Sequence, residues 1–160
     1  MLVLRQNRFK NFWVNNQNNI FLVQTDTTAG FASRCPISLS FAKQRNPNQK
    51  ILEVLNNFAT LKNLTRAPSK FRKFIRNSKK TTFIYPNGNS FRIVDKNSKH
   101  IDFVNKFRHI YSTSANKTGS KFDFEYAHNC CDVIVGNEFF ETQPSKIFKL
   151  SKGKIIKIRR

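Results

Sequence analysis

The chain has 160 residues, 39% of them hydrophobic, which is enough to bury a core and suggests a single domain. Its 29 Lys and Arg against 9 Asp and Glu give a formal net charge of +20, which favours polyanions such as RNA as partners. No apolar run approaches the roughly 18 residues of a membrane span, and no signal peptide opens the chain, so we expect a cytoplasmic protein.

The three cysteines, Cys35, Cys130 and Cys131, do not have the spacing of a disulfide framework or of a zinc site. The three histidines do not cluster with them along the chain. We therefore expect reduced, structural thiols and no metal held by protein side chains.

The first part of the chain predicts one strand with a polar end. Residues 1–19 are rich in Asn, Gln, Lys and Arg, and their pattern leaves a strand and a disordered arm both open. The apolar run at residues 20–23 predicts a strand. It leads into Gln24-Thr25-Asp26-Thr27-Thr28-Ala29-Gly30, a hydroxyl-rich strand end that closes on glycine.

Helical patterns follow. Pro36 suits the first turn of a helix, with Ile37, Leu39 and Phe41 facing inward. This helix would carry Lys43 and Arg45 and end at residues 46–48. Apolar residues at helical spacing predict two more helices, over the ranges 51–58 and 71–75.

The middle of the chain predicts a hairpin and then a helix. Residues 81–85 and 90–94 read as its two strands, joined by the turn sequence Pro86-Asn87-Gly88-Asn89. Ile101, Val104 and Phe107 mark an amphipathic helix, and Ile110 with Tyr111 reads as the end of a buried strand.

The last part predicts a short helix over 122–128, a buried strand over 132–135, and a closing hairpin of 146–150 with 154–158. Strands and helices are mixed along the chain, without repeats or linkers. The predicted fold is α/β, with a twisted and partly antiparallel sheet.

The loop Ser112-Thr113-Ser114-Ala115-Asn116-Lys117-Thr118-Gly119 concentrates small polar side chains behind a predicted strand. Ligands bind at such strand ends in α/β sheets, and short hydroxyls with free backbone N–H groups can surround phosphate oxygens. An ordinary surface turn has the same composition, so this loop alone leaves both readings open.

Several short motifs occur in a fixed order: Thr25-Asp26-Thr27-x-x-Gly30, Lys43-x-Arg45, Arg92, Ser114-Ala115-Asn116, Ser145 and Arg159. This order resembles the YrdC/YwlC-type family, the threonylcarbamoyl-AMP synthases. The resemblance runs from about residue 20 to the C-terminus and implies one YrdC-like domain over 20–160, whose sheet and helices surround a basic cavity.

The resemblance implies a nucleotidyltransferase that joins L-threonine, bicarbonate and ATP into threonylcarbamoyl-AMP. That product is the donor for N6-threonylcarbamoylation of tRNA adenosine 37, so tRNA and the downstream transferase proteins are implied partners. Magnesium would ride on the ATP phosphates. The residues implied for threonine are Thr27, Arg92, Ser112 and Ser145. Those implied for ATP are Lys43, Arg45, Ser114, Asn116 and Arg159, of which Lys43 and Arg45 would also neutralise charge in catalysis.

The chain departs from the family pattern in several places, and two of these departures remove part of the pattern. An Asn-Pro-Leu-x-x-His segment is missing after Lys43-x-Arg45, and the connection before Arg92 is cut to a hairpin. Part of the threonine lid is therefore absent. A non-catalytic relative that binds tRNA or double-stranded RNA is the alternative, and a carbamoyl-adenylating enzyme for another substrate is a third reading.

Overall fold

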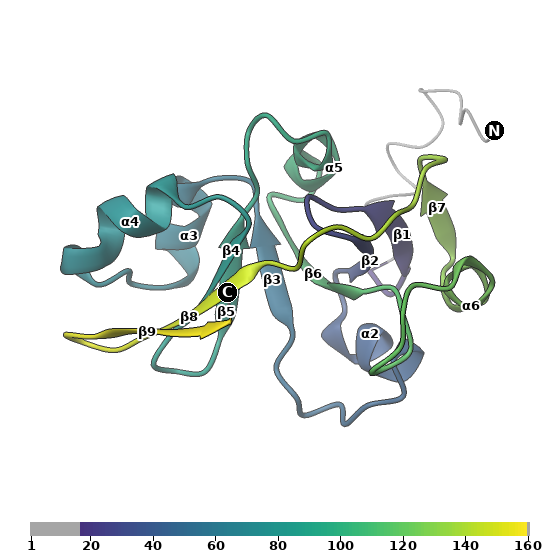
Figure 1. Ribbon diagram of the computed structural model, residues 1–160, viewed down its shortest axis with the longest axis horizontal. Helices are drawn as coiled ribbons and strands as arrows, with labels where there is room; N and C mark the ends of the chain where they lie inside the picture. Colours follow the sequence, from purple (N-terminus) through teal and green to yellow (C-terminus); the bar gives the residue numbers. More distant parts are fainter. Residues whose placement is uncertain (1–16, 160) are drawn as a thin grey trace.

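One twisted sheet of nine strands runs through the molecule, with helices packed against it (Figure 1). The structure is a computed structural model that describes residues 17–159, so the strand or arm expected over 1–19 lies almost entirely outside the described residues. The strands are β1 (Phe21–Gln24), β2 (Ala29–Ser33), β3 (Leu52–Leu55), β4 (Thr81–Ile84), β5 (Ser90–Ile93), β6 (His109–Ser114), β7 (Val133–Val135), β8 (Lys146–Leu150) and β9 (Ile155–Arg159). The helices are α2 (Pro36–Ala42), α3 (Phe58–Leu64), the 3-10 turn η1 (Ser69–Phe71), α4 (Arg72–Asn77), α5 (His100–Asn105) and α6 (Phe124–Cys130).

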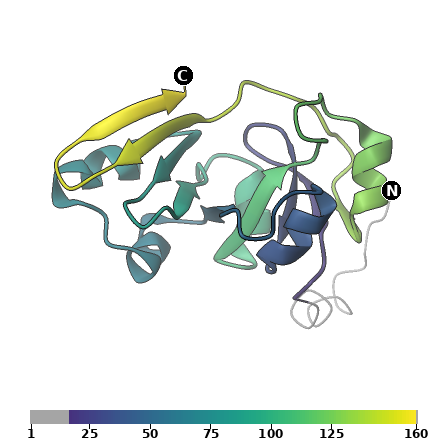
Figure 2. The same ribbon diagram turned by 90° about the horizontal axis from the view of Figure 1, so that it is seen from below.

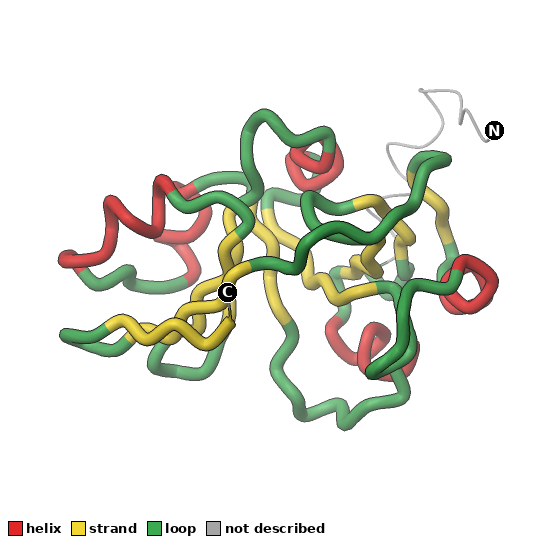
Figure 3. The backbone as a smooth tube through the Cα atoms, viewed as in Figure 1, coloured by secondary structure: helices red, strands yellow, loops and turns green. Residues whose placement is uncertain are grey.

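The strand order across the sheet is β7-β1-β2-β6-β3-β5-β4-β8-β9. The pairs β1–β7, β3–β5 and β4–β8 are parallel, and the other neighbours are antiparallel. Figure 3 shows this mixture of strands, helices and loops. The predicted α/β class with a mixed, partly antiparallel sheet is confirmed.

Alternation along β1 explains why helices lie on both faces of this end of the sheet. Leu22 packs into the cluster formed with α2 and α6, whereas Phe21 and Val23 pack into the cluster formed with α5. Successive side chains of a strand point to opposite faces, so one apolar run serves two helical layers. At the other end, α3, η1 and α4 cover β4, β5 and β8.

A long segment, residues 136–145, connects β7 at one end of the sheet to β8 near the other. We call it the crossing segment; Figures 1 and 2 show it passing over the middle of the molecule. It is tied to the β1–β2 turn by backbone hydrogen bonds from Ala29 N to Phe140 O (3.2 Å) and from Thr142 N to Thr27 O (3.0 Å). The turn and the crossing segment therefore form one unit.

The helix predicted over 51–58 is wrong, because residues 52–55 form β3 in the middle of the sheet. Val54 and Leu55 are both fully buried. A short run that is apolar on both faces has the same periodicity in a buried strand as in a buried helix, which explains the error. The strand β2 was not predicted. The strand β6 continues to Ser114, so the first hydroxyls of the predicted 112–119 loop belong to the strand.

The predicted orientation of the helix at Pro36 is also wrong for two residues. Ile37 and Phe41 are 52% and 69% exposed, whereas Leu39 is buried. The adjacent Ser40 is buried too, because its hydroxyl donates to the carbonyl of Pro36 at 3.2 Å. A small polar side chain that bonds its own helix can take a core position, and the apolar pattern then misplaces the inner face.

The other predicted elements are confirmed within one or two residues. These are β1, α4, the β4–β5 hairpin, α5, α6, β7 and the β8–β9 hairpin. Within residues 17–159, no helix has the length and apolar character that crossing a membrane requires.

The buried side chain of His100 should make the stability of the fold depend on pH. Its side chain is 3% exposed in α5, and burial lowers its pKa to about 4; the Asp26 carboxylate opposes this shift and Arg92 adds to it. The ordinary value is 6.5, so between these two values the unfolded chain binds a proton that the folded chain does not. The free energy of unfolding should therefore fall by about 3 kcal/mol as the pH falls through this window.

Urea denaturation of the wild type and of His100→Phe at neutral and at acidic pH measures this contribution. The variant keeps an aromatic ring against Phe103, on which His100 stacks. It should lose less stability than the wild type on acidification. Equal losses in the two proteins would show that His100 does not titrate as described.

Candidate active site

A cavity of about 450 Å³ opens between the β1–β2 turn, the middle strands and the β8–β9 hairpin. We call it the central cavity. Four cationic residues are among those lining it: Arg45, Lys50, Arg92 and Arg159. The described residues that line it include no Asp or Glu. Such a balance attracts anions, since cations at close quarters repel one another until a negative ligand arrives.

In the β1–β2 turn, the Thr25 hydroxyl forms hydrogen bonds within the turn, and this holds the Thr27 side chain at the central cavity. Thr25 Oγ1 donates to the carbonyl of Thr28 (2.6 Å) and accepts from the backbone N–H groups of Thr27 (3.2 Å) and Thr28 (3.1 Å). This turn fixes the position of Thr27. Gly30 is required beside it, because a Cβ there would lie 2.8 Å from Thr25 Cγ2.

Arg92, on β5, contacts this turn from the opposite side. Its Nη1 donates to Thr27 Oγ1 at 3.2 Å, and its Nη2 lies 3.5 Å from Asp26 Oδ1. The guanidinium is buried, which lowers the pKa of Arg92; Asp26 opposes that shift and Arg159 adds to it. Its Nε has no hydrogen-bond partner. Arg92 therefore lines the central cavity and also keeps a buried N–H that no described residue accepts.

Arg159 is held against Ser145 at the end of β9. Its Nε donates to the Ser145 carbonyl at 2.9 Å, and its Nη2 to Ser145 Oγ at 3.1 Å. Ser145 Oγ also lies 3.3 Å from Thr82 Oγ1 on β4. The closing hairpin thus brings a fixed guanidinium and a serine hydroxyl to the same wall.

Arg45 reaches the cavity because α2 ends at Ala42 and not near residues 46–48 as predicted, so Arg45 lies beyond the helix. Lys43 is the C-cap of α2, and Gln44 follows with a φ of +50°, which reverses the chain. Arg45 Nε is buried without a hydrogen-bond partner, and burial lowers the pKa of this guanidinium. A buried N–H without a partner is costly, so the geometry favours an anion that would accept from it.

Lys43 has a different position from Arg45. Its ammonium donates to the Ser114 carbonyl and to Asn116 Oδ1, both at 3.0 Å, and also to the Asn116 carbonyl. It therefore braces the loop after β6 and is not among the residues that line the central cavity. Burial, and secondly the charge of Arg45, lower the pKa of Lys43 to about 8.

This brace gives a prediction for Lys43→Met. Loss of its hydrogen bonds leaves the 114–116 carbonyls without a donor, so we expect a loss of about 1–3 kcal/mol in stability. Amide hydrogen exchange should become faster over residues 114–120 than elsewhere. Lys62→Met, at an exposed position of α3, is the matched control and should change neither quantity. Unchanged exchange in the loop of Lys43→Met would contradict the brace.

A smaller cavity of about 240 Å³ adjoins the central one, and both are lined by Thr28, Ser114 and Pro144. Asn116 and Phe122 line this smaller cavity. A ligand longer than the central cavity could extend along the 114–116 loop into it.

The structure brings seven of the nine predicted residues to the central cavity: Thr27, Arg45, Arg92, Ser112, Ser114, Ser145 and Arg159. Asn116 lies at the neighbouring cavity, and Lys43 lies behind the loop. The sequence reasoning did not find Lys50, whose ammonium is held by Asn89 Oδ1 at 2.8 Å on the β4–β5 turn. No pattern marks Lys50, because its place depends on β3 being a strand.

Within residues 17–159, no three His, Cys, Asp or Glu side chains come together in a way that could hold a metal ion. The central cavity offers cations and hydroxyls, which suit an anionic ligand and do not suit a metal bound by protein alone.

Comparison with known proteins gives similarity at the level of structure. No protein-family model and no curated protein matches the chain. The solution structure of the MTH1692 protein from Methanobacterium thermoautotrophicum is 16% identical, with a TM-score of 0.68, over 100% of this chain and 92% of that one. E. coli YciO is 14% identical, with a TM-score of 0.73, over 96% of this chain and 89% of that one.

The third similar structure is P. abyssi Sua5 in complex with L-threonine. It is 14% identical, with a TM-score of 0.74, over 94% of this chain and 53% of that one. This chain therefore spans about half the length of P. abyssi Sua5. These similarities establish that the chain shares the YrdC-like α/β fold of these proteins.

Proposed function

We propose that the protein is a threonylcarbamoyl-AMP synthase, which makes the donor for N6-threonylcarbamoylation of adenosine 37 in tRNA. The observation that carries this proposal is the central cavity, where the family's basic and hydroxyl residues meet without a carboxylate among the lining residues. The fold shared with P. abyssi Sua5, whose structure contains L-threonine, supports threonine as a substrate.

The proposed reaction needs anions to be held together. The amine of threonine combines with bicarbonate to a carbamate and water, and a carbamate oxygen then attacks the α-phosphorus of ATP as the bond to pyrophosphate breaks. The carbamate and the triphosphate repel each other, so the enzyme must align them and neutralise charge. Preorganised cations suit that task, and no nucleophilic side chain is required.

The fixed residues of the cavity divide into two groups in this proposal. Arg92 and Thr27 would hold the threonine carboxylate, which a guanidinium can meet with two N–H groups, and Ser112 and Ser145 line the same space. The unpartnered Nε of Arg45 suits a phosphate oxygen. ATP, with magnesium on its phosphates, supplies the electrophilic phosphorus, and Arg159, Ser114 and Asn116 would hold it.

Pyrophosphate release with ATP, magnesium and bicarbonate, in the presence and in the absence of L-threonine, tests the proposal. We expect release that depends on threonine, and little release when serine or valine replaces it. Equal release with several amino acids would point to another substrate. A protein that binds ATP in calorimetry yet releases no pyrophosphate under any condition would contradict the synthase.

A second candidate function is binding of tRNA or double-stranded RNA, and the β8–β9 hairpin favours it. This hairpin exposes five lysines and no carboxylate between residues 146 and 157: Lys146, Lys149, Lys152, Lys154 and Lys157. Such a stripe can follow a phosphate backbone. Binding releases counterions from the nucleic acid, and this release is less favourable at high salt, so the affinity falls steeply as the salt concentration rises.

Charge reversal separates the two functions. Lys152→Glu with Lys154→Glu, at the hairpin tip, should weaken tRNA binding at least tenfold and reduce its dependence on salt. The same double variant should leave ATP affinity unchanged, because neither residue lines the central cavity. Filter binding at two salt concentrations measures the first effect. Unchanged tRNA affinity would exclude the hairpin as the RNA surface.

A further inference from the structure

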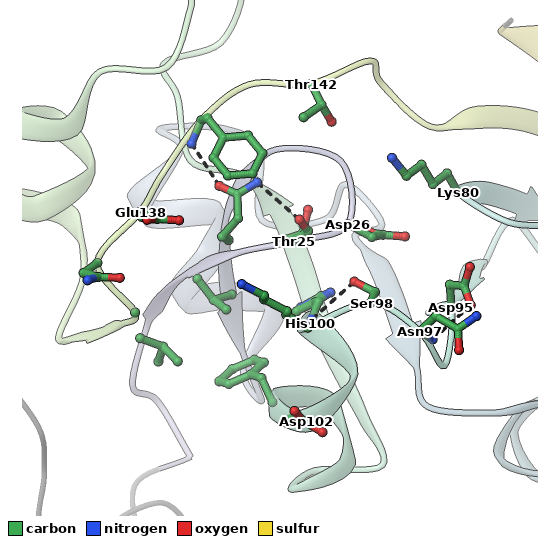
Figure 4. A pocket seen from close by; sticks show the side chains of 18 of the residues that line it. Thr25, Asp26, Lys80, Asp95, Asn97, Ser98, His100, Asp102, Glu138 and Thr142 are labelled. Carbon is green, nitrogen blue, oxygen red and sulfur yellow. Dashed lines mark hydrogen bonds between the residues drawn. The ribbon is translucent and has the colours of Figure 1, made fainter.

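A second, larger cavity of about 880 Å³ lies on the other side of the β1–β2 turn (Figure 4). We call it the outer cavity. Its walls come from the ends of β1 and β7, from α5 with the residues before it, and from the crossing segment. Thr25 lines both this cavity and the central one, so the two cavities adjoin at the β1–β2 turn. The proposed synthase reaction makes no use of this space.

The charges of the outer cavity are unlike those of the rest of the chain. Four of the nine acidic residues line it: Asp26, Asp95, Asp102 and Glu138. Only three of the 29 Lys and Arg do so: Lys80, Lys99 and Lys106. In a chain with a net charge of +20, this is where carboxylates gather. Figure 4 shows these carboxylates spread around the cavity, with Asp26 at the upper right, Glu138 at the left and Asp102 at the bottom of the view.

Two side chains at the wall of this cavity are buried and lack hydrogen-bond partners. The Asp26 side chain is 2% exposed, and neither carboxylate oxygen has a hydrogen bond; its one ion-pair contact is Arg92 Nη2 at 3.5 Å. His100 is 3% exposed, and neither ring nitrogen has a partner. Its low pKa keeps the ring neutral, so it adds no positive charge. Buried polar groups are normally satisfied, so this pair points to a ligand with N–H donors.

Two carboxylates at the rim of the outer cavity are not engaged in ion pairs with described residues. Asp95 is paired with Lys79 at 2.9 Å. In the described part of the chain, neither Asp102 nor Glu138 takes part in an ion pair. Between rim and floor the wall is apolar, with Val23, Phe103 and Ile134. A chain of methylene groups with a cationic end suits this sequence of surfaces.

We propose that the outer cavity binds a small organic cation, an aliphatic ammonium or guanidinium compound, whose N–H groups donate to Asp26 and whose second charged end meets one of the rim carboxylates, Asp102 or Glu138. A metal ion is the poorer occupant, because no three ligating side chains converge among residues 17–159. The long-range field of this basic protein repels cations, so any cation that binds does so through a local arrangement of acids.

Isothermal titration of the full chain with 1,4-diaminobutane tests the proposal, and agmatine distinguishes an ammonium from a guanidinium end. 1,4-Butanediol, which has the same chain without charge, is the ligand control. We expect saturable binding of one diamine per chain and no heat with the diol. No saturable binding of either cation up to about 10 mM would overturn the proposal.

Variants locate the binding. Asp102→Asn combined with Glu138→Gln changes only exposed rim residues and should weaken diamine binding at least fivefold. Glu125→Gln is the matched control, since Glu125 also lies in the first turn of a helix and is exposed, but is remote from the lining of this cavity. Asp26→Asn should abolish binding if the variant folds. Equal loss in the rim and control variants, or no loss in either, would overturn the assignment. These outcomes do not depend on the synthase activity.

Discussion

Replacing Arg92 with methionine should destabilise the fold by about 3–5 kcal/mol, because it leaves the buried carboxylate of Asp26 without its cation. Both side chains of this pair are nearly inaccessible, at 5% for Arg92 and 2% for Asp26. The Thr27 hydroxyl would lose its donor as well. Urea denaturation followed by circular dichroism measures the change.

The double variant Arg92→Met with Asp26→Asn is the control for this prediction. Removal of both charges leaves no uncompensated ion, so the double variant should regain at least half of the lost stability. A double variant no more stable than Arg92→Met would mean that the cost comes from packing around the methionine and not from the orphaned carboxylate.

Arg45→Ala should have the largest effect on the proposed activity with little effect on the fold. No side-chain hydrogen bond or ion pair of Arg45 is present among residues 17–159, and its Nε is buried without a partner. A preorganised donor of this kind contributes about a hundredfold to turnover where charge develops. We expect threonine-dependent pyrophosphate release to fall by about that factor.

Arg34→Ala is the matched control, because it removes one guanidinium from an exposed position that lines none of the three cavities. It should leave both turnover and melting temperature unchanged. If Arg45→Ala keeps full turnover, or loses as much thermal stability as a core variant, its side chain acts in the fold and not on the substrate.

The sequence predicts this fold best where a pattern has only one structural solution. The β8–β9 hairpin follows from two apolar runs around a Gly turn, and α5 follows from Ile101, Val104 and Phe107. It fails at β3, because burial on both faces removes the alternation that identifies a strand. It also fails at β2, where every residue of Ala29–Ser33 except Phe31 is small, so the strand carries almost no periodic signal.

The candidate site was predictable as a set of residues but not as an arrangement. Thr27 and Arg92 are 65 positions apart and meet only because β5 pairs with β3, β3 with β6, and β6 with β2, which follows Thr27. The order of the motifs reveals the set. The positive φ of Gln44 turns Lys43 toward the loop and Arg45 toward the cavity. The spacing of residues in the sequence does not predict this backbone conformation. The outer cavity has no sequence signature, since only the three-dimensional structure shows that the side chains of Asp26 and His100 lack hydrogen-bond partners.

The position of the crossing segment in the chain affects how the protein folds during synthesis. Residues 136–159 provide one wall of each of the three cavities, and they are the last part of the described chain to be synthesised. On the ribosome, the six strands β1 to β6 could pair before that wall exists. The nascent chain would then carry a sheet without binding sites, and competence for every ligand would arise in one late step, when β8 docks on β4.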